Sequence, residues 1–266
     1  MPLYVVATPI GNLDDVSPRV RDVLGAVALI MAEDTRRTRT LLSALDIPTP
    51  ELMSCHAHNE PSRVDSVMAR LAEGQDVAIV CDAGTPCISD PGGFIVAAAH
   101  AAGHRVETIA GPSSITAALA ASGFPASPFH FLGFPPRKAG PLDRWLKTAS
   151  AYPGTLVMLE SGRRCGKLIA AVATAMPDRE AAICRELTKR HETILRGPVV
   201  DLPTEPQRGE VVVVVGSGAP AQTESPAPSG PELKAIAASL AERWGCSKRE
   251  AYQRLIALEQ SASDGA

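Results

Sequence analysis

Short runs of apolar and β-branched residues recur along the first half of the chain and alternate with stretches of helical spacing. The runs cover residues 3–7, 27–31, 77–81, 105–109 and 129–134, and each predicts a strand. Between them, residues 64–71, 94–102 and 115–121 carry apolar side chains at helical intervals or are rich in alanine. Strands that alternate with helices predict a mostly parallel sheet covered on both faces.

The pattern changes at residues 135–142 (PPRKAGPL), where prolines, a glycine and two cations predict a linker between domains. After it, strands are expected at residues 155–159, 181–185, 192–195 and 210–215, with one helix near residues 167–174. The connections are shorter here, which favours a more antiparallel arrangement. The sequence therefore predicts two α/β domains, over residues 1–134 and 142–216.

The remaining residues predict a tether and a small helical module. Residues 217–231 are rich in Pro, Gly, Ser and Ala and favour a flexible tether, and residues 232–260 favour a helical hairpin. The first helix would end at Gly245, and the second would open with a capping box formed by Ser247 and Glu250. Four apolar residues fall on one stripe of the first helix, namely Leu233, Ile236, Leu240 and Trp244. A packing module is favoured over nucleic-acid binding, because a short helical hairpin is a weak motif.

Composition places the chain among globular proteins and limits its partners. Of its 266 residues 45% are hydrophobic, 21% are charged and 4% are aromatic. No stretch approaches the roughly 18 apolar residues of a membrane span, and the first residues lack the features of a signal peptide. The six scattered cysteines favour free thiols, and hence a cytoplasmic protein. With a net charge of −3, binding to nucleic acid would require a local basic surface.

Two glycine motifs and one histidine pair resemble known binding motifs, but their sequence context excludes those functions. Gly216-x-Gly218-x-x-Ala221 has the letters of a dinucleotide fingerprint but runs into the predicted tether instead of a helix. Gly162 to Lys167 resembles a phosphate loop, but it is one residue short and lacks the following hydroxyl. His56 and His58 have no third ligand at a metal-binding spacing, so no metal is expected.

Three loops shaped by glycine and proline follow predicted strands of the first domain. Their candidate ligand-binding residues are Pro9, Gly11 and Asn12, then Asp82, Ala83, Gly84, Thr85 and Pro86, and finally Ser113 and Ser114. The carboxyl ends of parallel strands flank the crevice where ligands sit, so the loops are expected to converge on one ligand. A single such loop would more simply turn a corner or cap a helix, but three together favour a binding site.

Strings spread over the chain resemble the ribosomal RNA small-subunit methyltransferase I family, a tetrapyrrole methylase-like group of class III methyltransferases. The strings are ATPIGNLDD, AEDTRRT, HNE, DAGTPCISDPG, GPSSITAALAASG, GFPPRK, RELTKRHE and RGE. The resemblance implies two α/β domains with S-adenosylmethionine in the cleft between them, and it places the three loops on the cofactor side. It further implies a homodimer that methylates the 2′-hydroxyl of a cytidine in the decoding centre of 16S rRNA, within the 30S small ribosomal subunit. One departure is the stretch ESGRR at residues 160–164, which lacks the histidine common there.

Methyl transfer to a hydroxyl requires an aligned, dry cleft and no metal. A ribose hydroxyl is a poor nucleophile near neutral pH, so a base or an electrostatic partner is expected. The candidates are Glu33 beside Asp34, His58, and Lys189, and the sequence does not rank them. Each also has a structural alternative, respectively a helix-start ion pair, a hydrogen bond to a loop carbonyl, and a contact to phosphate.

Local clusters of cations would form an RNA-binding surface if they share a face. The candidates are Arg36, Arg37, Arg137, Lys138, Arg163, Arg164 and Arg185. Two other functions stay open. A methyltransferase acting on a tetrapyrrole would require a wide apolar pocket, which the low aromatic content disfavours. A ribosome-assembly factor would bind RNA without catalysis.

Overall fold

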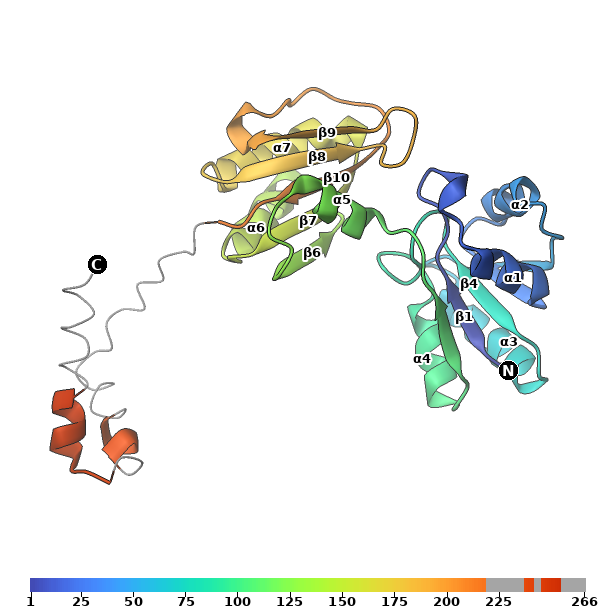
Figure 1. Cartoon of the computed structure of the whole chain (residues 1–266), viewed down its shortest axis with the longest axis horizontal. Helices are drawn as coiled ribbons and strands as arrows, with labels where there is room; N and C mark the ends of the chain where they lie inside the picture. The colour runs from blue at the N-terminus through green and yellow to red at the C-terminus, as the bar shows by residue number, and fades with distance from the viewer. Residues whose placement is uncertain (219–236, 242–244, 255–266) are drawn as a thin grey trace. The chain divides into compact units, whose positions relative to one another are not determined.

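The computed structural model describes residues 1–218, 237–241 and 245–254. Met1–Gly218 form one compact unit that contains two five-stranded sheets (Figure 1). Residues of this unit carry all the candidate binding and catalytic side chains. The two sheets differ in strand direction and in how helices cover them.

The first sheet is parallel throughout, with strand order β3-β2-β4-β1-β5. Its strands are β1 (Leu3–Val6), β2 (Leu29–Ala32), β3 (Glu51–Ser54), β4 (Val77–Val80) and β5 (Val106–Ile109). The strands β2 and β4 are buried along their whole length, as expected for strands covered on both faces. Successive side chains point to opposite faces, so Ile30 and Met31 belong to different apolar clusters.

Four helices cover the two faces of the first sheet. Side chains of α1 (Pro18–Ala26) and α2 (Thr35–Ala44) pack in one cluster, and those of α3 (Glu60–Ala72) and α4 (Gly93–Ala101) pack in the other. A short 3-10 helix, η1 (Leu13–Asp15), follows β1. The predicted parallel sheet with helices on both faces is therefore confirmed.

The second sheet is mostly antiparallel, with strand order β6-β7-β10-β8-β9. Its strands are β6 (Phe129–Gly133), β7 (Thr155–Ser161), β8 (Glu180–Arg185), β9 (Thr193–Pro198) and β10 (Glu210–Val215). Only the pairing of β6 with β7 is parallel. One face packs against α6 (Ala139–Ser150), α7 (Gly162–Ala175) and the 3-10 helix η2 (Val199–Asp201), and the other packs against α5 (Ser114–Ser122).

The boundary between the sheets differs from the prediction. The sequence placed residues 129–134 in the first domain, whereas β6 pairs with β7, and α5 contacts β8, β9 and β10. The chain therefore crosses to the second sheet between β5 and α5. Residues 135–142 are not a linker between sheets, because they end in the first turn of α6. Pro141 fits there, since the first turn of a helix leaves its N–H groups without helical partners.

In the second unit, Ala219–Ala266, residues 237–241 and 248–254 are helical, and both segments fall within the range predicted to form the hairpin. Gly245 has a left-handed φ of 60°. The Ser247 amide donates to Glu250 Oε2 at 2.9 Å and the Glu250 amide donates to Ser247 Oγ at 3.3 Å, which confirms the capping box. Leu233, Ile236, Trp244 and the predicted tether from residue 219 onward lie outside the described residues.

Candidate functional site

The loops after β1 and β4 are joined by their backbones. The Thr8 amide donates to Gly84 O at 2.8 Å, and the Gly84 amide donates to Thr8 O at 3.0 Å. The Thr8 side chain is fully buried, and its hydroxyl donates to Cys81 O at 3.1 Å. Gly84 has a φ of 87°, a left-handed conformation that disfavours any other residue at this position.

The loop after β5 closes onto the other two. Thr85 Oγ1 donates to Pro112 O at 3.3 Å. A Cβ atom on Gly111 would lie 2.9 Å from the Cβ of Ala7, so the third loop passes the first at a distance that only glycine allows. The three loops therefore meet in space at the carboxyl ends of β1, β4 and β5.

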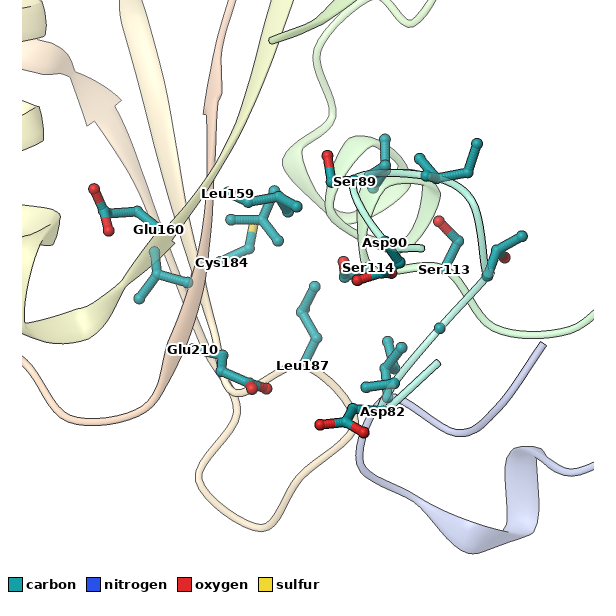
Figure 2. Close-up of a pocket in the computed structure, with 18 of the residues that line it drawn as sticks. Asp82, Ser89, Asp90, Ser113, Ser114, Leu159, Glu160, Cys184, Leu187 and Glu210 are labelled. Atoms are coloured by element: carbon teal, nitrogen blue, oxygen red, sulfur yellow. The ribbon is translucent and has the colours of Figure 1, made fainter. Parts of the chain in front are cut away.

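A cavity of about 420 Å³ lies between these loops and the second sheet (Figure 2). This volume is in the range of small-molecule sites. Six of the residues predicted to bind the ligand line the cavity, namely Asp82, Ala83, Gly84, Thr85, Ser113 and Ser114. Figure 2 shows Leu159, Cys184 and Leu187 of the second sheet and its loop on the opposite side. The cavity thus has a polar side from the first sheet and a partly apolar side from the second.

Four predicted ligand-binding residues do not line the cavity: Pro9, Gly11, Asn12 and Pro86. Gly11 serves a different purpose from the expected approach to a ligand. A Cβ atom there would contact the Lys189 side chain, and it would lie 2.9 Å from Thr188 Oγ1 and 3.1 Å from Leu187 O. Gly11 therefore lets the first loop pack against the second sheet's β8–β9 loop. Ile10, which lies in the same predicted loop, does line the cavity.

Two carboxylates from neighbouring strand ends are held together at one side of the cavity. Glu33 Oε2 accepts a hydrogen bond from the Asp82 amide at 3.2 Å. Asp82 Oδ1 in turn accepts from the Asp34 amide at 3.1 Å, and its Oδ2 lies 3.2 Å from Arg37 Nη1. Partial burial and the charge of Glu33 raise the pKa of Asp82 despite this arginine.

A third carboxylate, Asp90, lines the same cavity, and sequence reasoning did not single it out. Burial, and then the nearby charge of Glu33, raise its pKa to about 6. The neighbouring Cys81 thiol lowers the pKa in part, and within the described residues no cation forms an ion pair with Asp90. Asp90 follows two non-glycine residues with left-handed backbones, Cys87 (φ 68°) and Ser89 (φ 66°). Such strain is typical of functional loops.

Lys189 lies in the cavity wall between two carboxylates. Its Nζ donates to Glu186 Oε1 at 3.0 Å and to Glu210 Oε2 at 2.7 Å. Partial burial lowers the pKa of Lys189, but the hydrogen bonds to Glu210 and Glu186 outweigh it, and the net pKa is above its ordinary value. Lys189 is therefore a stable ammonium group, which is the wrong protonation state for the predicted base.

His58 is exposed and does not line the cavity, so the structure does not bring it to the other candidates. The rest of the HNE string shapes local structure. Asn59 Oδ1 accepts from the His56 amide at 2.7 Å. Glu60 is buried, and its Oε1 accepts from the Phe94 amide at 2.7 Å at the start of α4. A carboxylate at a helix N-terminus stabilises the helix.

The predicted RNA-binding cations divide into two groups. Four are engaged within the chain: Arg36 with Asp34, Arg37 with Asp82, Arg164 with Glu160, and Arg185 with Thr193. Arg137, Lys138 and Arg163 are exposed, and within the described residues they form no ion pair. These three are therefore exposed and free of intramolecular ion pairs among the described residues, so they are available to an anionic partner.

Arg164 and Glu160 connect the start of α7 to the loop that follows β6. Arg164 Nη2 lies 3.0 Å from Glu160 Oε2, and it donates to Pro135 O and Pro136 O, both at 3.3 Å. The Glu160 side chain is only 3% exposed, and the residue lines the cavity. Neither this pairing nor the burial of Glu160 was predicted, because the partners come from separate elements.

The described part of the chain carries neither a helix suited to crossing a membrane nor a cluster of His, Cys, Asp and Glu suited to holding a metal ion. A family model described as tetrapyrrole (corrin/porphyrin) methylases matches residues 2–203.

Curated relatives named ribosomal RNA small subunit methyltransferase I match most of the chain, and two of them serve as examples. The protein from Xylella fastidiosa (strain Temecula1) is 43% identical over 224 residues, which cover 82% of each chain. The protein from Pseudomonas aeruginosa (strain PAO1) is 41% identical over an alignment of 275 positions, which covers 96% of each chain.

Solved structures with the same fold are more distant in sequence. The methyltransferase CobJ has a TM-score of 0.60 at 21% identity, covering 82% of this chain and 94% of its own. The uroporphyrin-III C-methyltransferase from Thermus thermophilus, in complex with S-adenosyl homocysteine, has a TM-score of 0.55 at 15% identity, covering 81% of this chain and 96% of its own. These structures establish the likeness of fold.

Proposed function

Since the chain belongs to the ribosomal RNA small subunit methyltransferase I family of tetrapyrrole methylases, we propose that it transfers a methyl group from S-adenosylmethionine to RNA. The acceptor we propose is the 2′-hydroxyl of a cytidine in the decoding centre of 16S rRNA. The observation that carries this proposal is the cavity formed where three strand-end loops meet and face the second sheet.

The cavity suits a methyl donor that carries positive charge. Glu33, Asp82 and Asp90 line it together, and negative side chains favour a sulfonium and an ammonium group. The start of α5 supplies backbone amides for a carboxylate, and Ser113 makes no side-chain cap there. We therefore propose that Asp82, Gly84, Thr85, Ser113 and Ser114 hold the cofactor, with Gly11 shaping the site from outside.

Bound S-adenosylmethionine would supply a methyl group activated by a positively charged sulfur. The chain must then align the acceptor hydroxyl, exclude water and accept one proton. We assign proton acceptance to Asp90, because it lines the cavity without a cationic partner and its pKa of about 6 leaves it ionised near neutral pH. Lys189 is already protonated, and Glu33 is engaged by the Asp82 amide.

The exposed cations support RNA as the acceptor. Arg137 and Lys138 lie in the short loop between β6 and α6, and Arg163 lies in the first turn of α7. Cations of this kind contact phosphates and set the register of a nucleic acid on a protein. The structures of tetrapyrrole enzymes share the fold at low identity, which is not evidence of a shared substrate. The homodimer and the cytoplasmic location stay predictions.

Transfer of tritium from labelled S-adenosylmethionine tests this function. The acceptor would be small ribosomal subunits from a strain that lacks this methyltransferase, digested afterwards to nucleosides. We expect label in 2′-O-methylcytidine. Label in uroporphyrinogen but not in RNA would instead select a tetrapyrrole enzyme. If the protein bound small subunits but had no affinity for S-adenosylmethionine, the result would favour an assembly factor.

A further inference from the structure

Two exposed apolar side chains line the cavity from opposite loops. Phe134, directly after β6, is 62% exposed, and Ile88, in the loop after β4, is 46% exposed. A single exposed apolar residue is ordinary on a protein surface. Phe134 and Ile88 differ from that case, because they line the same cavity from the two sheets and form an apolar edge where the cavity meets solvent.

The two loops that carry these side chains lie against each other. A Cβ atom on Gly133 would be 3.4 Å from Ser89 Oγ. Gly133 precedes Phe134 and Ser89 follows Ile88, so the two loops are in contact next to these side chains. Gly133 has a left-handed φ of 66°, and the pairing register of β6 shifts between Phe131 and Gly133. A bulge at a strand end redirects the residues that follow it. Here that residue is Phe134.

The loop after β6 is anchored by Arg164 at the start of α7. Arg164 donates to both Pro135 O and Pro136 O and is itself paired with the buried Glu160. A side chain on a fixed backbone loses less entropy when it binds than one on a free loop. The backbone that follows Phe134 is therefore anchored, although the Phe134 side chain is exposed.

Two cations follow Phe134 closely in the sequence, after Pro135 and Pro136. Arg137 and Lys138 are exposed, and neither has an acidic partner in the described residues. The cavity behind the apolar pair is acidic, with Glu33, Asp82 and Asp90 in its wall. A ligand that fits both features has a flat uncharged part beside an anionic backbone.

We propose that Phe134 and Ile88 clamp the base of the target nucleotide, while Arg137 and Lys138 hold the neighbouring phosphates. This inference rests on the proposed function and adds how the substrate is presented. A nucleotide within a stack cannot reach a group inside a cavity, and enzymes hold an extruded base between aromatic and apolar side chains. Stacking requires only a π-face, which Phe134 offers.

The test measures methyl transfer to small subunits by Phe134→Ala, Phe134→Trp and Ile88→Ala proteins. We expect Phe134→Ala to lower kcat/KM for the subunit about 10- to 100-fold, from the loss of one stacked base. Phe134→Trp should keep most of the activity, and Ile88→Ala should lose less than Phe134→Ala. The affinity for S-adenosylmethionine, measured by titration calorimetry, should stay unchanged in all three proteins.

Phe94→Ala provides the matched control, because Phe94 is 64% exposed but does not line the cavity. We expect this protein to retain wild-type kcat/KM. Wild-type kcat/KM in both Phe134→Ala and Ile88→Ala would overturn the clamp while leaving the proposed function intact. Wild-type protein that binds S-adenosylmethionine but methylates no RNA would overturn both. An equal loss in Phe134→Ala and Phe134→Trp would also contradict stacking.

Discussion

The two sides of the cavity are built in different ways. On the side of the first sheet, backbone contacts between loops define the surface: Thr8 and Gly84 exchange two amide hydrogen bonds, and Gly111 passes directly over Ala7. On the side of the second sheet, side chains define it, with Leu159 and Cys184 projecting from strands and Lys189 set between glutamates.

This difference predicts how each side responds to change. A surface made by the backbone tolerates few substitutions, because a Cβ atom in the wrong place displaces several loops together. A surface made by side chains can be altered one group at a time. We therefore expect the loop backbone of the first side to govern whether the methyl donor binds, and single side chains, Asp90 above all, to set how fast it reacts.

The largest effect is expected at Gly84. In a Gly84→Val protein the residue must adopt a left-handed φ, and its side chain would enter the cavity near Ile10. Affinity for S-adenosylmethionine, measured by calorimetry, should fall at least about 100-fold, or about 2.7 kcal/mol. Gly197→Ala is the control, because a Cβ atom there meets nothing within 4 Å. If the affinity of the Gly84→Val protein were unchanged, the proposed position of the cofactor at these loops would be wrong.

The next effect is expected at Asp90, the one side chain on the first side that we place in the chemistry. Asp90→Asn should lower kcat about 10²- to 10⁴-fold, the usual contribution of a general base, and leave cofactor affinity within a few-fold. In wild-type protein kcat should rise with pH through about 6, as Asp90 loses its proton. A flat pH profile from 5 to 8, with full activity in the variant, would exclude this role.

Asp90 also has a consequence for stability. Its pKa is raised from 3.8 to about 6 in the folded protein, so the folded state holds this proton more strongly than the unfolded state. Stability therefore falls as pH rises from about 4 to about 6. Because asparagine does not ionise, the Asp90→Asn protein should have a higher Tm than wild type at pH 7. If the Tm difference between variant and wild type were the same at pH 4 and at pH 7, the pKa shift would be contradicted.

A smaller effect is expected where the two sides touch. Gly11→Ala places a Cβ atom against Thr188 Oγ1 and the Leu187 carbonyl. Overpacking of this kind costs about 1–3 kcal/mol. Urea unfolding should show that loss, together with weaker binding of S-adenosylmethionine. Unchanged stability would mean that the loops on the two sides do not pack as closely as described.

The smallest effect is expected at Lys189 on the second side. Lys189→Ala removes a partly exposed ammonium group from Glu186 and Glu210, and such pairs contribute about 1 kcal/mol or less. We expect the free energy of unfolding to fall by about that amount, with kcat and cofactor affinity close to wild type. A loss of kcat as large as that of Asp90→Asn would make Lys189 part of the proton transfer after all.

Much of the fold could be predicted from local pattern. The apolar runs that became β1, β4 and β10 are unbroken and β-branched, and those strands are largely buried. The edge strand β3, with the letters ELMS, was missed because it is short and partly exposed. Periodicity identified β6 but could not show which sheet it joins, since that depends on pairing with β7.

The site was predicted only as far as it depends on local sequence. Glycine and proline in three loops indicated the convergence, because those residues determine backbone turns. The state of Lys189 depends on Glu210, which comes from another strand, and the pKa of Asp90 depends on burial in the assembled cavity. Tertiary contacts of this kind leave no periodic signal along the chain.

A crystal structure with S-adenosylhomocysteine bound tests the central claim most directly. We predict that the ligand fills the cavity and contacts the backbone at Gly84 and Thr85 and the start of α5 at Ser113 and Ser114. A ligand bound elsewhere, with these loops untouched, would contradict the account.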